Sequence, residues 1–524
     1  MLGLRARLRD PGFWIDFLVV ALLGNFGIIF RTMLVQNRMR MPAGDAFNFI
    51  NGATELLYGK YPPQEKRPPF FSFLIAILDS FIQDPIDTSH IIIVISGVLG
   101  IIFMYFIGRY FGVYRPVMAG FSFLALFDPL LALYGVRPLS QGLFFALLTL
   151  TVLLALHIKT SRWYLAAMAL SFTALALTRQ EGVLISAVVW ALLFLKLPWK
   201  KVLLVALMSC VFVAPWFVVI ARSTGSPFKF PGSEAYVEEF ASGERGTKDP
   251  RVVLAGIAEI SMETWAIAWN SSVLVTPEGE ESADNTPDAI AAFLVALLAI
   301  IGLGWMTVRR PKDMAIFFAA FALIVVIAAW YRASGKYASP FISTWYICAA
   351  AGLTAVSEIV RRLYSGAAFS GRLGAYIATI AIVWPLAPAL AISGTSYIVS
   401  ERGMNWARVQ AVRYVRTFEA PVLIPDFTLL SRSYFGKVGE KTEPPHLGIY
   451  LINVSEQSVE EQRTYIISKG AQYIIDDGTE GILKLTQYLQ ERKEITLEKL
   501  FVSYLEGDQT GQLIYVYRFS PRWR

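Results

Sequence analysis

Charged residues that could do chemistry lie in four short segments between long apolar runs. The first segment, 44–73, reads GDAFNFINGATELLYGKYPPQEKRPPFFSF, and the others are YGVRPLSQ (134–141), TRQEG (178–182) and YRASGKYASP (331–340). A simple connector between two membrane helices needs no Gly-Asp turn, amphipathic run and pair of Pro-Pro elements, so the first segment indicates a structured loop with a function. The candidate site residues in these segments are Asp45, Glu65, Lys66, Arg67, Arg137, Gln141, Arg179, Glu181, Arg332 and Lys336.

Cations outnumber acids among these residues, which favours an anionic ligand. Arginine binds phosphate oxygens through two parallel hydrogen bonds, so a cavity lined in this way suits a phosphate group. A carboxylate beside such cations could act as a general base, and Asp45 is the candidate. Asp45 also precedes an amphipathic run, where a helix N-cap is expected, so a purely structural role for it stays open. The cation cluster around it favours catalysis.

The composition places these segments in a membrane protein. The chain has 524 residues, of which 55% are hydrophobic, 14% aromatic and 17% charged. A soluble domain could not bury that much apolar surface, which indicates a polytopic α-helical membrane protein. The net charge of +7 follows from basic loops, and no basic-aromatic motif predicts nucleic-acid binding. The three histidines and two cysteines form no set with metal-ligand spacing, so we expect no metal and no other cofactor.

About eleven apolar runs are long enough to span a bilayer when their flanks are included. With the N-terminus inside, every predicted inside loop is basic, which supports this topology. The four segments above, the loops 36–89 and 222–288, and a juxtamembrane helix at Pro69–Phe81 are then extracytosolic. The predicted spans are 13–35, 90–110, 116–134, 139–156, 163–177, 182–197, 202–221, 289–308, 314–331, 338–355 and 374–393.

The composition changes after the last span, which predicts two domains, 1–395 in the membrane and 396–524 outside it. Strand-length runs occur at 422–427, 450–453, 471–477 and 513–519. Helical patterns at 404–418, 457–469 and 481–492 lie between them. Alternating strands and helices predict a small extracytosolic α/β domain.

The order of these motifs resembles the GT-C superfamily of membrane glycosyltransferases that use polyprenyl-phosphate sugars. The likeness covers roughly residues 10–400 and is strongest to the protein O-mannosyltransferase-like and lipid A aminoarabinose transferase-like branches. It rests on a first outer loop that opens with an acid, a Lys/Arg–Pro–Pro element before an aromatic helix, TRQEG, and GKYASPFIS (335–343). Two departures are the Arg67 inserted before Pro-Pro and a Gln141 where the family often has an acid. Asp128, just before Pro129, could substitute for that acid, although its position favours a polar residue at a kinked helix end.

The resemblance implies an inverting transfer at the outer face of a cytoplasmic (inner) membrane, or of the endoplasmic reticulum membrane in a eukaryote. Asp45 would activate the acceptor, which could be a glycolipid, a glycan or a protein. Lys66, Arg67, Arg179 and either Arg332 or Lys336 would hold the carrier phosphate. The competing interpretation is a transporter or flippase for lipid-linked sugars, although its usual repeated halves and midplane charges are absent from the sequence.

Overall fold

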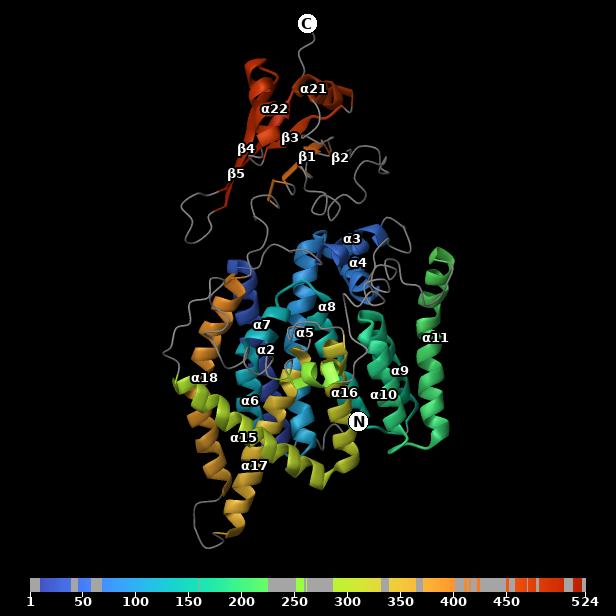
Figure 1. The fold of residues 1–524 in the computed structure, drawn as a ribbon, viewed down its shortest axis with the longest axis vertical. Coiled ribbons are helices and arrows are strands. Elements are labelled where there is room, and N and C mark those ends of the chain that lie inside the picture. Colours follow the sequence, from blue (N-terminus) through green and yellow to red (C-terminus); the bar gives the residue numbers. More distant parts are fainter. Residues whose placement is uncertain are drawn as a thin grey trace. The chain divides into compact units, whose positions relative to one another are not determined.

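The chain folds into a helical part and a small mixed sheet (Figure 1). The structure is a computed structural model, and it forms two compact units that we describe separately. The first contains α2 and the helices between His90 and Glu401, and the second contains α3, most of α4 and the C-terminal sheet. The described residues are 10–38, 46–57, 68–159, 161–224, 251–258, 261, 286–330, 339–363, 371–400, 410–411, 414–415, 422–424, 449–451, 458–468, 470–476, 480–503 and 512–520.

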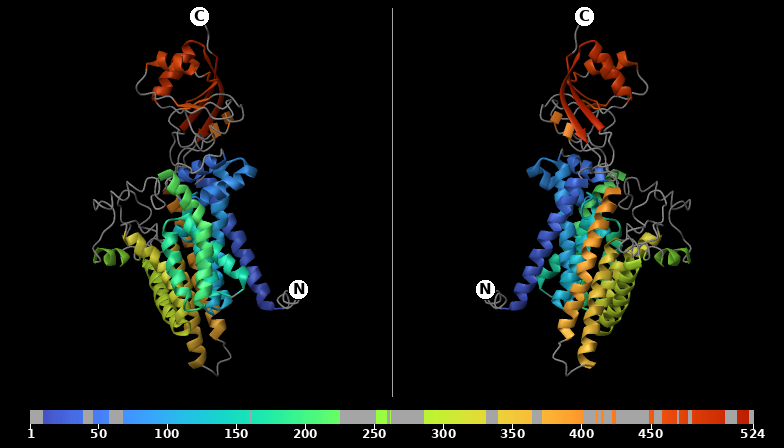
Figure 2. Two further views of the ribbon diagram at one scale, coloured as in Figure 1. Left: turned by 90° about the vertical axis from the view of Figure 1, so that its right-hand side faces the viewer. Right: turned by 90° about the vertical axis from the view of Figure 1, so that its left-hand side faces the viewer.

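Every predicted span is helical, and most of these helices run alongside one another in the side views (Figure 2). Within the described ranges, 6 helices are long and apolar enough to cross a membrane, namely α2, α5, α11, α16, α17 and α18. The protein is therefore a polytopic membrane protein. The helices of this part are α2 (Pro11–Arg38), α5 (Pro85–Tyr110), α6 (Arg115–Phe127), α7 (Pro129–Tyr134), α8 (Ser140–Leu156), α9 (Arg162–Thr178), α10 (Glu181–Leu193), α11 (Trp199–Thr224), α15 (Thr286–Arg309), α16 (Pro311–Trp330), α17 (Ile342–Leu363) and α18 (Gly371–Ser400).

The predicted span 116–134 is two helices rather than one, with the break at Asp128. This residue has an extended backbone (φ −55°, ψ 127°), as expected before a proline. Pro129 then starts α7, where its missing N–H costs no hydrogen bond. The Asp128 carboxylate caps α7 by accepting from the backbone N–H groups of Leu130 and Leu131, both at 3.0 Å. The sequence Asp-Pro thus ends one helix and starts the next.

Two helices of the first outer loop are also present. α3 (Ala46–Leu57) buries Phe47, Phe49 and Ile50, as its amphipathic sequence predicts. α4 (Phe70–Ile82) follows the second Pro-Pro pair, and its Ser72 hydroxyl donates to the Phe49 carbonyl at 2.9 Å. The helix predicted at Pro69–Phe81 therefore exists, and its position at the membrane surface stays a prediction.

Loops that are predicted to lie on the inner side meet at one end of the helical part. Asp313, at the start of α16, forms an ion pair with Lys196 after α10 (Nζ–Oδ1 2.8 Å). The Tyr110 hydroxyl at the end of α5 donates to the other oxygen of the same carboxylate at 2.8 Å. Three loops far apart in the sequence are thus held together, as the alternation of the predicted topology requires.

The C-terminal sheet has five strands in the order β2-β1-β3-β5-β4. β1 is parallel to β2 and β3, whereas β5 is antiparallel to β3 and β4. Two helices, α21 (Val459–Ser468) and α22 (Glu480–Glu491), pack on it through Ile466, Leu485 and Leu489. The α/β architecture is confirmed, and β4 is a strand that the sequence patterns did not predict. The strands are β1 (Val422–Ile424), β2 (Ile449–Leu451), β3 (Tyr473–Asp476), β4 (Ile495–Ser503) and β5 (Gln512–Phe519).

A bidentate ion pair joins α21 to the start of β4. Arg463 Nε and Nη2 donate to the two carboxylate oxygens of Glu494, each at 2.7 Å, and the Glu494 side chain is only 3% exposed. These hydrogen bonds raise the pKa of Arg463 above its usual value.

We expect Arg463→Ala in the full-length protein to destabilise α21 by about 2–3 kcal/mol, because it leaves a buried carboxylate without its main partner. Hydrogen exchange of the α21 amides should become faster. The matched control is Arg492→Ala, whose 3.7 Å pair with Glu460 is exposed on both sides and should change local stability by less than about 0.5 kcal/mol. Equal exchange in the two variants would contradict this role of the pair.

Candidate active site

The structure places four of the ten predicted site residues. Arg137 lies in the connection from α7 to α8, and Gln141 lies in the first turn of α8. Arg179 lies in the connection from α9 to α10, and Glu181 is the first residue of α10. The other predictions fall outside the described residues, so their roles stay predictions. These are Asp45, Glu65, Lys66, Arg67, Arg332 and Lys336.

The TRQEG segment forms a tight turn with an internal ion pair. α9 ends at Thr178, and Arg179 is its extended C-cap. Arg179 Nη2 lies 2.7 Å and Nε 3.3 Å from the two carboxylate oxygens of Glu181. Gly182 is required at this turn, because a Cβ there would lie 2.1 Å from the Leu175 carbonyl oxygen. The acid therefore holds the guanidinium in a fixed orientation at the end of the helix pair.

Arg179 also contacts α8, the helix that carries Gln141. Its Cζ lies 5.7 Å from the centre of the Phe144 ring, a cation–π distance. Phe144 is one turn after Gln141, which is buried at 8% exposure. The predicted segment 178–182 thus contacts α8 one turn beyond the end of the predicted segment 134–141.

The α7–α8 connection, which carries Arg137, is held by hydrogen bonds from several elements. The Arg137 N–H donates to the Leu133 carbonyl at 2.9 Å, and the Leu139 N–H donates to the Arg137 carbonyl at 2.7 Å. His90 Nδ1, at the start of α5, lies 3.0 Å from the Val136 carbonyl oxygen and can donate to it. No sequence pattern predicts this role of His90, because its partner is 46 residues away.

A buried polar cluster lies beneath this connection. The Tyr346 hydroxyl on α17 donates to Asp128 Oδ2 at 3.0 Å, and both residues are at most 1% exposed. Arg31 on α2 is fully buried, and its Nη2 lies 3.5 Å from the Leu131 carbonyl oxygen. Asp128 is thus a helix cap within an electrostatic cluster, rather than a second carboxylate of the predicted site.

Arg31 was missed by sequence reasoning, although its signal is present. It is a single arginine inside the apolar run of α2, and such charges are rare in membrane spans unless they have a specific role. Glycines make room for it, because a Cβ on Gly135 would lie 2.4 Å from Arg31 Nε and one on Gly97 would lie 3.0 Å from it. Arg31 therefore packs against the α7–α8 connection at Gly135.

We expect Asp128→Ala to destabilise the helical part by about 2–4 kcal/mol. The change removes the cap of α7 and leaves the buried hydroxyl of Tyr346 without its acceptor. Asp128→Asn is the matched control, because its amide oxygen can keep the cap of α7, whereas its nitrogen replaces the oxygen that accepts from Tyr346. Thermal unfolding in detergent should rank the wild type above Asn and Asn above Ala. An Ala variant as stable as Asn would contradict the capping role.

Metal ligands do not cluster in the part of the chain that the structure describes. Within those ranges, no group of three or more His, Cys, Asp or Glu side chains could hold a metal ion. The metal-free mechanism expected from the sequence stays a prediction, because Asp45 and Glu65 lie outside these ranges.

Comparisons with known proteins identify the fold. No protein-family model and no curated protein matches the sequence. Two crystal structures of ArnT from Cupriavidus metallidurans match with a TM-score of 0.55, one bound to undecaprenyl phosphate at 13% identity and one in the apo state at 14% identity. Each match covers 96% of this chain and 99% of that chain.

The oligosaccharyltransferase AglB from Archaeoglobus fulgidus, in complex with an inhibitory peptide and a dolichol-phosphate, also matches. Its TM-score is 0.50 at 14% identity, over 89% of this chain and 69% of that chain. The matched proteins are GT-C glycosyltransferases. At these identities the likeness is one of fold, and it extends over almost the whole chain. The protein therefore has the fold of the GT-C membrane glycosyltransferases, as the resemblance in its sequence predicts.

Proposed function

We propose that the protein is a glycosyltransferase that moves a sugar from a polyprenyl-phosphate carrier to an extracytosolic acceptor. The observation that carries this proposal is the match over 96% of the chain to a structure with bound undecaprenyl phosphate. The ion pair that holds the Arg179 guanidinium at the end of α9 supports it, because an oriented guanidinium can bind phosphate oxygens. The proposal includes the predicted outer-face location and a cytoplasmic-membrane localisation.

The proposed reaction is a single displacement with inversion. The acceptor hydroxyl or amine attacks the anomeric carbon while the bond from that carbon to the carrier phosphate oxygen breaks. The bonding electrons leave with the phosphate, and Asp45 takes the proton of the acceptor. The products are the glycosylated acceptor and free polyprenyl phosphate.

In this proposal the cations stabilise the leaving phosphate. Lys66, Arg67 and Arg179 bind its oxygens, together with Arg332 or Lys336. Negative charge increases on the phosphate as the bond breaks, so each well-placed donor should contribute about 3–4 kcal/mol to the barrier reduction. The Glu181 carboxylate keeps the Arg179 guanidinium in place before the donor binds. No metal is needed, because Arg and Lys can balance the charge of a monophosphate.

Mass spectrometry of membrane lipids and glycans from cells with and without the protein would test the proposal and identify the acceptor. We expect one glycan or glycolipid species to lose a sugar when the protein is absent. If the protein were a transporter or flippase, its absence would instead cause the unmodified donor to accumulate in the cells.

A second assay incubates the purified protein with the lipid-linked donor and membrane acceptors. A transporter leaves the sugar–phosphate bond of the donor intact, and that result would contradict the proposed function.

A further inference from the structure

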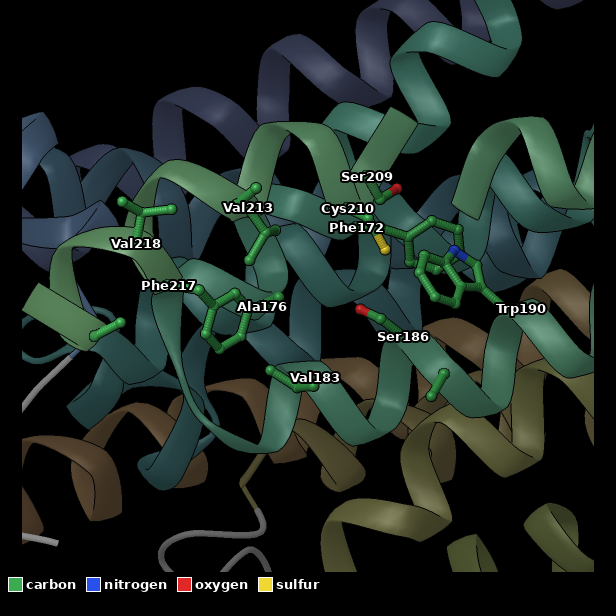
Figure 3. A pocket seen from close by; sticks show the side chains of 13 residues that line it. Phe172, Ala176, Val183, Ser186, Trp190, Ser209, Cys210, Val213, Phe217 and Val218 are labelled. Carbon is green, nitrogen blue, oxygen red and sulfur yellow. The ribbon is translucent and has the colours of Figure 1, made fainter. Parts of the chain in front are cut away.

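A cavity lies among α9, α10 and α11, and its lining begins beside the TRQEG segment, at Ala176 and Val183 (Figure 3). Its volume of about 520 Å³ is in the range of ligand sites. The walls are mainly apolar, with Phe172 and Ala176 from α9, Val183 and Ala187 from α10, and Phe217 from α11 among the lining side chains. α11 is one of the candidate membrane spans, and only 28% of its apolar window is buried. Val183, Val218 and Cys210 line the cavity and are exposed, so the cavity opens on the outer surface of these helices, which faces lipid in a membrane-spanning bundle.

Two polar groups in the cavity wall lack partners among the described residues. Ser186 is 5% exposed, and its Oγ points into the cavity without a hydrogen bond (Figure 3). Trp190 Nε1, one turn further along α10, is also buried and unpartnered. Leaving a buried donor unpaired costs about 1–3 kcal/mol, and an indole N–H that is buried usually has an acceptor. Both groups can donate, so they indicate an acceptor oxygen in the cavity.

Other hydroxyls in the same helices are satisfied, which makes Ser186 unusual. Ser171 donates to the Met168 carbonyl at 2.9 Å, and Thr173 donates to the Ala169 carbonyl at 2.9 Å. Ser209, which also lines the cavity, donates to the Val205 carbonyl at 2.9 Å. Serine and threonine in membrane helices commonly bond to their own backbone in this way. Ser186 has no such bond and is available to a ligand.

The position of Ser186 and Trp190 along α10, and their ability to donate hydrogen bonds, indicate which molecule the cavity binds. Ser186 is five residues after Glu181, which places it about 7 Å below that charged end of α10. The carbonyl of an acylated lipid lies near this level, where the headgroup meets the acyl chain. A polyprenyl chain is a hydrocarbon with no acceptor beyond its phosphate. One water molecule bound to the two donors would fill only about 30 Å³ of this cavity, so it would leave the apolar walls without contacts.

We propose that the cavity binds one fatty-acyl chain of an acylated membrane lipid, whose ester or amide carbonyl accepts a hydrogen bond from Ser186, with Trp190 as a second donor. The site is separate from the proposed carrier-phosphate site and does not depend on the proposed reaction. Apolar side chains of α9, α10 and α11 hold the chain, and the two donors set its depth.

The test is photo-crosslinking of the full-length protein in detergent with phosphatidylglycerol that carries a diazirine in one acyl chain. We expect saturable labelling of peptides from α9, α10 and α11, with competition by unlabelled phosphatidylglycerol. Ser186→Ala should weaken the apparent affinity about 3–10-fold, the effect of one net hydrogen bond. Ser171→Ala is the matched control, since its hydroxyl bonds within α9, and it should bind like the wild type.

A second variant, Ala187→Phe, fills the cavity and should remove the saturable labelling while the protein elutes as a folded monodisperse peak. Labelling that is not saturable, or that falls on other peptides, would overturn the proposal. Competition by undecaprenyl phosphate but not by phosphatidylglycerol would show a polyprenyl site instead. Equal affinity in Ser186→Ala and the wild type would overturn the assigned hydrogen bond.

Discussion

Replacing Asp45 by asparagine is expected to lower sugar transfer by about 10²–10⁴-fold, the usual contribution of a general base. Asparagine has nearly the same shape and can still cap a helix, but it cannot take the proton of the acceptor. The donor should therefore bind almost normally. The measurement is single-turnover transfer from a radiolabelled lipid-linked sugar, with donor binding measured on the same preparation.

A contrasting variant separates catalysis from binding. Arg67→Ala should weaken donor binding as well as transfer, because it removes a cation from the carrier phosphate. Asp45→Asn should change only the transfer rate. Near-normal turnover in Asp45→Asn would show that Asp45 is the helix cap that the sequence also allows, and the general base would have to be another residue.

Gly302→Ala is expected to cause the largest loss of stability in the helical part. α15 and α17 approach so closely that a Cβ on Gly302 would lie 1.8 Å from the Cys348 carbonyl oxygen. The same is true in reverse, since a Cβ on Gly352 would lie 1.9 Å from the Leu298 carbonyl oxygen. Small residues allow this kind of backbone contact between membrane helices. Backbone atoms cannot move aside as a flexible side chain does, so the cost should be about 3 kcal/mol or more.

The control for this variant is in the same helix. A Cβ on Gly304 would meet nothing within 4 Å, so Gly304→Ala should be neutral or slightly stabilising through its helix propensity. Both variants are compared by the midpoint of thermal unfolding in detergent and by the yield of monodisperse protein. A Gly302→Ala protein as stable as Gly304→Ala would contradict the close helix contact.

The helical part was largely predictable from the sequence, because the apolar length of each run reflects a bilayer-scale constraint. The break at Asp128 and Pro129 was only partly visible, since the same run of apolar residues continues across it. β4 was missed because Glu498 and Lys499 interrupt its apolar pattern, and it is an edge strand with an irregular register between Leu497 and Lys499. Edge strands often carry charges, which weakens their signal.

The charged segments of the candidate site can be recognised in the sequence, and their assignment to one site stays a prediction, whereas the residues that support them cannot be recognised there. A lone arginine such as Arg31 indicates a buried role, yet its contact with the Leu131 carbonyl joins residues 100 positions apart. His90 is similar, because its carbonyl partner is set by how α5 packs beside the α7–α8 connection. Tertiary packing decides these pairs, and no local pattern encodes them. The contact of Arg179 with Phe144, which lies inside the predicted span 139–156, is also decided by packing.

The most direct test of the central claim is the release of free polyprenyl phosphate from a lipid-linked sugar by the purified full-length protein in the presence of membrane acceptors. We expect release in step with glycosylation of the acceptor, and loss of both in Asp45→Asn. A wild-type protein that moves the lipid-linked sugar across a vesicle membrane with the sugar–phosphate bond intact would contradict the account.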